Sequence, residues 1–72
     1  MKYVVIELQD NGESVANLVN AYDNVYQAEQ KYHQVLSAAA VSSVPCHSAV
    51  MMNSEGQYIK SEAYKHGENQ EA

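Results

Sequence analysis

The 72-residue sequence predicts an α+β domain of topology ββαββ, in which one helix packs on one face of a four-stranded antiparallel sheet. Two observations predict this class. Only the segment 23–40 repeats apolar residues at helical spacing, and two short segments rich in β-branched and aromatic residues lie on each side of it. A helix of about 16 residues is marginal alone in water, so its apolar stripe must pack on a sheet formed by both flanks. Placing the first strand beside the third gives the strand order 2-1-3-4.

The first hairpin is predicted within residues 1–22. Segment 1–9 is short and rich in β-branched residues, as a strand requires. One face of this strand would carry Val4, Ile6 and Leu8, and the other Tyr3, Val5 and Glu7. Asn11-Gly12 is a strong turn signal, because both residues tolerate positive φ. The second strand, 15–22, alternates imperfectly, so we place it at an edge of the sheet and expect a bulge or an irregular register.

The central helix is predicted within residues 23–40. Its apolar stripe consists of Val25, Ala28, Tyr32, Val35, Leu36 and Ala39. Either Asp23 or Asn24 is a suitable N-cap. Segment 41–45 ends the helix, because Pro45 lacks an N–H and forces the preceding residue into extended geometry. We expect Tyr32, on the stripe, to be a core residue.

The second hairpin is predicted from strands 47–53 and 57–65, joined by a tight turn at 53–56. Residues 67–72 contain no large apolar side chain, so we expect them to form a disordered acidic tail. A single domain would then span residues 1–66.

Composition limits the classes of function. The net charge is −5 with four Lys and no Arg, a balance that disfavours binding to nucleic-acid phosphates. Cys46 is the single cysteine, which excludes an internal disulfide and favours a reducing compartment. No segment is typical of a targeting sequence or of a membrane span. We therefore expect a cytoplasmic protein that binds neither membrane nor nucleic acid.

One helix can cover only one face of the predicted sheet. We expect the other face to carry Tyr3, Val5, Val50, Met52, Tyr58 and Tyr64. That set is too apolar for plain exposure to solvent. The predicted core is also light, since it relies on alanine and tyrosine with three Leu, two Ile and no Phe or Trp. Both observations predict a homodimer that associates through the uncovered face, hence a non-enzymatic interaction module, with another phage or host protein as the alternative partner.

The residues that could bind a metal or act in catalysis give only weak evidence of such a site. Cys46 and His47 could be imagined in a metal site or a nucleophilic pair with His33 or His66, but neighbouring residues on a strand point in opposite directions. We interpret them as a thiol at the start of a strand and solvated histidines. The sequence thus predicts no metal, cofactor or catalytic residue.

The acidic residues leave two further interpretations. Glu7, Glu62 and Lys60 could share the uncovered face, where cross-strand charge pairing is commoner than acid–base catalysis. The acidic excess also keeps open an alternative function, a small-ligand or inhibitor protein such as an acidic DNA mimic that acts on a host enzyme.

Two blocks carry a resemblance to a known group of proteins. They are residues 17–23, N-L-V-N-A-Y-D, and residues 31–42, K-Y-H-Q-V-L-S-A-A-A-V-S, and the similarity extends from Lys2 to His66. The chain resembles short proteins encoded by gut Clostridia and by their prophage-like regions, a group with no assigned activity. The resemblance implies an accessory or structural phage-related protein and transfers no catalytic or binding residue.

Overall fold

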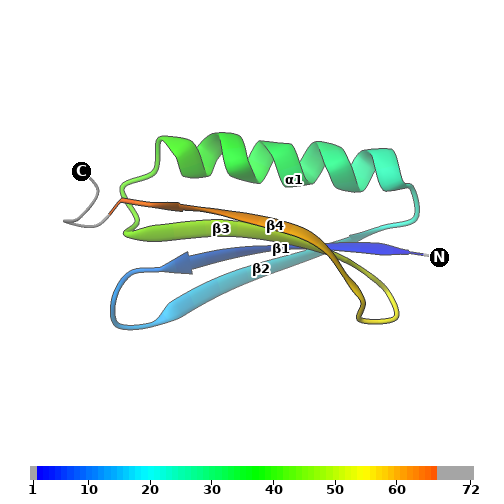
Figure 1. Ribbon diagram of the computed structural model, residues 1–72, viewed down its shortest axis with the longest axis horizontal. Helices are drawn as coiled ribbons and strands as arrows, with labels where there is room; N and C mark the ends of the chain where they lie inside the picture. The colour runs from blue at the N-terminus through cyan, green and yellow to red at the C-terminus, as the bar shows by residue number, and fades with distance from the viewer. Residues whose placement is uncertain (1, 67–72) are drawn as a thin grey trace.

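A computed structural model describes residues 2–66 of the chain and shows a four-stranded antiparallel sheet with one helix lying along one face (Figure 1). The elements in chain order are β1 (Tyr3–Asp10), β2 (Val15–Tyr22), α1 (Val25–Ala40), β3 (Cys46–Asn53) and β4 (Tyr58–Lys65). The strand order is β2-β1-β3-β4. The predicted α+β class and topology are confirmed. The tail predicted at 67–72 lies outside the described residues.

The register of the sheet is regular on the β2 side and irregular on the β4 side. β1 pairs with β2 residue for residue, from Tyr3 opposite Tyr22 to Asp10 opposite Val15. The edge position of β2 is confirmed, but the bulge expected there is wrong, because the register shift lies between β3 and β4 at Met51/Met52.

The turn before β2 explains why this strand pairs regularly. The Asn11 side-chain oxygen accepts from the backbone N–H groups of Glu13 and Ser14, at 2.9 and 3.0 Å. Gly12 adopts φ 97°, which a residue with a side chain rarely does. A turn of fixed geometry sets the register of the strands that follow it.

α1 begins and ends where the sequence predicts. The N-cap is Asn24, whose side-chain oxygen accepts from the N–H groups of Tyr26 and Gln27 at 2.7 and 3.3 Å. Val41 is the C-cap. The predicted stripe faces the sheet, with five of its members buried: Ala28, Tyr32, Val35, Leu36 and Ala39. Val25, the sixth member, is partly buried against the core.

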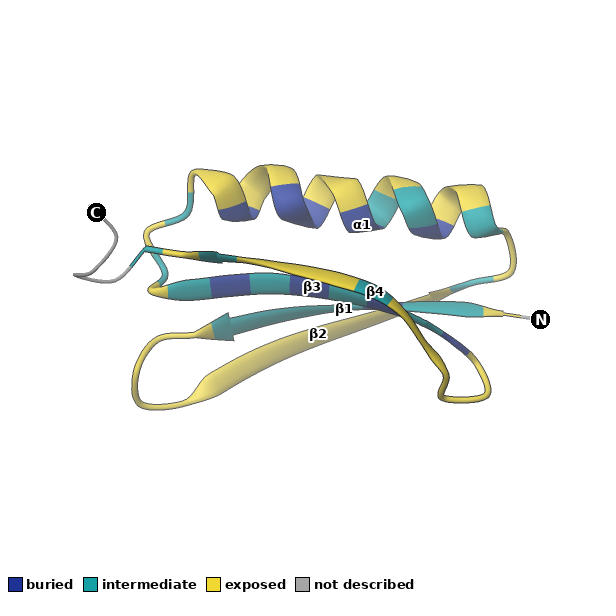
Figure 2. Cartoon of the chain, viewed as in Figure 1, coloured by how far each residue is buried: buried dark blue, intermediate teal, exposed yellow. Residues whose placement is uncertain are grey.

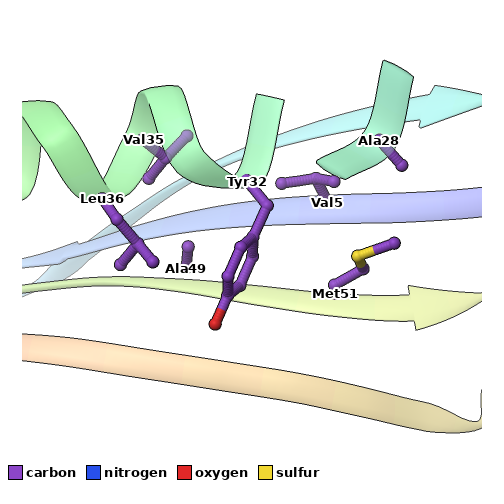
Figure 3. Close-up of a cluster of buried hydrophobic side chains, with 7 residues drawn as sticks. All are labelled: Val5, Ala28, Tyr32, Val35, Leu36, Ala49 and Met51. Atoms are coloured by element: carbon purple, nitrogen blue, oxygen red, sulfur yellow. The ribbon is translucent and has the colours of Figure 1, made fainter. Parts of the chain in front are cut away.

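The core lies between α1 and the two central strands (Figure 3). Ala28 on the helix and Ala49 on β3 are both fully buried, and their small size lets the helix approach the sheet closely. The Tyr32 ring fills the space between them and β4, and the Lys60 ammonium lies 4.9 Å from the centre of that ring. Lys60 also donates to both carboxylate oxygens of Glu29 on the helix, at 2.7 and 2.8 Å, which fastens β4 to α1.

The two faces of β1 are opposite to the assignment made from the sequence. Val5 is 1% exposed in the core, whereas Ile6, its neighbour, faces away from the helix. The expectation that Val5 and Tyr3 lie on the uncovered face is therefore wrong. Tyr64 is also misplaced, because it lies opposite the buried His47 and packs with Tyr3 against the core.

Candidate interaction face

The face of the sheet away from α1 is defined by the strand register. Three cross-strand rows, read from β2 to β4, are Ala21-Val4-Met52-Tyr58, Val19-Ile6-Val50-Ser61 and Asn17-Leu8-Ser48-Ala63. These twelve positions are called the open face below. Directly opposite residues of antiparallel strands share a face, so the buried neighbours of these positions fix which way each row points. Among the described residues, no helix or strand covers the open face (Figure 1).

The open face carries no charged side chain. Of the charged strand residues, Glu7, Lys60 and Glu62 are on the helix side, whereas Asp10 and Lys65 belong to a fourth row that lies on the same side of the sheet as the open face, at its end. The expectation that Glu7, Glu62 and Lys60 share the uncovered face is therefore wrong. On the side of the sheet away from α1, the charged strand residues are therefore confined to this end row, and the three rows of the open face are uncharged.

Exposure on the open face increases from the centre of the sheet to its edges. The central members, such as Ile6 and Val50, are half-buried by their neighbours, whereas Val19 is 58% and Tyr58 65% exposed. Four strands about 4.8 Å apart and three rows of about 6.6 Å each give the open face an area of about 400 Å². That is as large as the largest apolar patch of a typical monomer, and such patches often mark binding sites.

Three of the six residues that the sequence predicted for the uncovered face lie on the open face. Val50, Met52 and Tyr58 lie on the open face, and their role as interface residues stays a prediction. The sequence analysis missed the β1 members of the open face, which are Val4, Ile6 and Leu8, and Val19 beside them on β2. No local signal distinguishes the two faces of β1, because both contain apolar residues.

β2 is exposed along nearly its whole length (Figure 2). α1 packs mainly against the other three strands, so Leu18 is 62% exposed even though it lies on the helix side of the sheet. A hollow of about 220 Å³ borders this edge and is lined by Glu7, Gln9, Ala16, Asn17 and Leu18. The sheet thus presents two uncovered surfaces, its open face and its β2 edge.

A buried polar pair lies beneath the C-terminal half of α1. His47 is 4% exposed, and its Nε2 lies 2.6 Å from the Glu7 carboxylate, which also accepts from the Gln9 side-chain amide at 3.0 Å. The prediction that His47 is solvated is wrong, because its strand parity places it with Ala49 on the helix side.

The electrostatics of this pair favour an ionised carboxylate. Burial alone would raise the pKa of Glu7, but the hydrogen bonds from His47 and Gln9 outweigh it and lower the pKa below its ordinary value. Nδ1 of His47 is buried and has no hydrogen-bond partner among the described residues.

The remaining candidate groups lie apart from one another. Cys46 is half-buried and points to the side of the sheet opposite to His47, as predicted. His33 is exposed on α1, 3.4 Å from Glu29. His66 stacks on Tyr64, and its Nε2 lies 2.8 Å from the carbonyl oxygen of Ala39. The structure therefore does not bring these four side chains into one site.

Comparison with known proteins assigns the chain to no family: no protein-family model, curated protein or solved structure matches it. Within residues 2–66, no group of three or more His, Cys, Asp or Glu side chains is placed to hold a metal ion. α1 has 16 residues, and none of the described residues form a helix that could cross a bilayer.

Proposed function

We propose that this chain is a non-enzymatic interaction module that self-associates through its open face. The observation that carries the proposal is the absence of charge from all twelve positions of the open face, in a chain of net charge −5. The most apolar set of β1 lies at the centre of this surface instead of in the core. Exposed apolar area of this extent is costly in water, and burial against a partner relieves that cost.

A second copy is the simplest partner of matching chemistry. The open face is uncharged and mostly apolar, so it is complementary to itself, and a two-fold axis would let each copy use the same residues. Face-to-face packing would leave both helices on the outside, where their exposed residues, such as Gln30 and Gln34, are polar. We further propose, from the resemblance stated above, that the module is an accessory or structural phage-related protein.

Two other functions receive less support. An acidic DNA mimic needs a dense stripe of free negative charge, but three of the acidic residues have partners: Glu7 with His47, Asp23 with Lys2 and Glu29 with Lys60. An enzyme built on His47 would need that ring to reach a substrate, and the helix covers it.

Substitution of Ile6 by Lys tests the proposal. Ile6 lies between Val19 and Val50 in the middle row, so association would bury an ammonium without a partner. We expect the dissociation constant, measured by sedimentation equilibrium, to rise by at least about 100-fold. Gln34→Lys, on the exposed side of α1, makes the same change in charge and should leave association unchanged. An Ile6→Lys chain that folds and associates as the wild type does would refute the proposal.

A further inference from the structure

The outer edge of β2 has the properties of a strand that accepts another strand. It runs for 8 residues in regular register, contains neither a charge nor a proline, and is exposed along nearly its whole length. The opposite edge, β4, carries Lys60, Glu62 and Lys65 and a register shift, which are features that block edge pairing. β2 therefore has the features of an edge that pairs with another strand, and β4 has those of an edge that is protected from pairing.

The hydrogen-bond pattern identifies the β2 groups that point outward. The N–H of Ser54 donates to the carbonyl of Lys2 at 2.9 Å, so by alternation the even-numbered residues of β1 bond to β3 and the odd-numbered ones to β2. The N–H of Asn11 donates to the carbonyl of Ser14 at 3.2 Å, which gives the same alternation from the turn. The β2 residues whose N–H and C=O point away from β1 are Val15, Asn17, Val19 and Ala21.

We propose that β2 pairs antiparallel with β2 of a second copy, with a two-fold axis at Leu18, so that two four-stranded sheets become one sheet of eight strands. The proposal rests on self-association and adds a contact distinct from the open face. Opposite residues of an antiparallel pair share a face of the sheet. The two-fold axis must therefore place one residue directly opposite the same residue of the second copy, and it cannot be centred between two successive residues.

The number of hydrogen bonds selects the residue on the axis. With Leu18 on the axis, Val15 lies opposite Ala21 and Asn17 opposite Val19 of the second copy, and every outward group of both strands is paired in eight backbone hydrogen bonds. With Val19 on the axis, Val15 of each copy loses its partner and six bonds remain. The register centred on Leu18 is therefore favoured.

The same register covers exposed apolar side chains. Leu18 would lie against Leu18 of the second copy, beside the hollow that borders this edge. Because the axis is perpendicular to the sheet, both helices stay on one side, and the two open faces merge into one surface. At each end Glu13 approaches Asp23 of the second copy, and Lys2 already neutralises that carboxylate at 2.6 Å.

The size of the open face gives an independent reason for a second contact. Two faces of about 400 Å² bury about 800 Å², which is below the lower limit of about 1,000 Å² for a specific interface. Edge pairing adds area and eight backbone hydrogen bonds, and it leaves the side chains of Asn17, Val19 and Ala21 on the open face. With the two perpendicular axes intersecting, the two contacts together predict a closed tetramer with a mass four times the 8.0 kDa of one chain.

Proline substitutions at the two ends of one row test the edge. Asn17 and Ala63 end the same row at opposite edges, and each has an outward N–H that the monomer does not need. Both variants change an end position of the same open-face row, so any weakening of the open-face contact is common to them. We expect Asn17→Pro to lose the edge contact and Ala63→Pro to keep it, as measured by the assembly mass in sedimentation velocity. Asn17→Pro assembling as the wild type would overturn the inference. If Ile6→Lys leaves assembly intact while Asn17→Pro abolishes it, the open-face proposal fails and the edge inference stands.

Cross-linking tests the register directly. In a Cys46→Ser background, Leu18→Cys places two thiols opposite each other at a non-hydrogen-bonded site with Cα atoms about 4.5 Å apart, within the range of a disulfide. Ala16→Cys is the control, since its two thiols would be offset by about 13 Å along the strands. We expect mild oxidation to give a covalent dimer at least 10-fold faster for Leu18→Cys. Equal rates, or no cross-link at Leu18, would overturn the register.

Discussion

Met51 and Met52 are adjacent residues of the same type on opposite faces of β3. The same substitution at each position therefore compares the effect of a change in the core with that of a change on the open face. Met51 is fully buried between α1 and the sheet, whereas Met52 is half-buried on the open face. Met51→Ala removes buried atoms and leaves a cavity, at a cost of about 2–5 kcal/mol in the free energy of unfolding. A domain of 65 described residues has only about 3–10 kcal/mol in total, so this variant should be largely destabilised.

Met52→Ala should have a different effect. No cavity forms on an uncovered face, so we expect a loss of about 1 kcal/mol or less in the monomer. The change in strand propensity is common to both variants and cancels in the comparison. Association should instead weaken, since a central apolar contact of the open face is lost.

Urea unfolding at low and high protein concentration measures both effects. Self-association stabilises the wild type at high concentration by mass action, and Met52→Ala should reduce that dependence while Met51→Ala lowers stability at every concentration. If the monomer loses as much stability from Met52→Ala as from Met51→Ala, the assignment of the two faces is wrong.

Two further predictions concern the helix side of the sheet. Because the folded pKa of Glu7 is lowered, its contribution to stability should be fully present above its ordinary pKa of 4.5 and be lost as the pH falls through the folded value. Glu7→Gln should cost about 1.5–3 kcal/mol at pH 7. Glu7→Gln should also reduce the loss of stability at acid pH, as measured by thermal unfolding at several pH values. An unchanged pH dependence of stability would contradict the pairing with His47. Asn24→Ala should cost about 1 kcal/mol by loss of the N-cap, as measured by urea unfolding. Substitution of exposed Gln30 by Ala serves as its control, and equal small effects would contradict the capping role.

Local chemistry determined the parts of the fold that could be predicted. The Asn24 cap, the stop before Pro45 and the turn at Gly12 depend on residues within a few positions of one another. The stripe around Tyr32 has a period that only a helix satisfies. These features fix the elements, and short connections then leave few topologies.

The orientation of β1 could not be predicted, because both of its faces contain apolar residues. The more apolar set, centred on Ile6, would ordinarily face the core, but the helix side instead receives Val5 together with Glu7. That polar residue is tolerated there because His47, 40 positions away in the chain, supplies a hydrogen bond. Such a pair has no local signal in the sequence, and its discovery requires the register of β1 against β3.

Sedimentation equilibrium of the wild-type chain tests the central claim most directly. Over protein concentrations from about 1 µM to about 1 mM, which span the usual range of weak to moderate association, the mean mass should rise from 8.0 kDa toward a multiple of it. A mass that stays at 8.0 kDa throughout this range would show that the open face is stable in water alone, and would contradict the account.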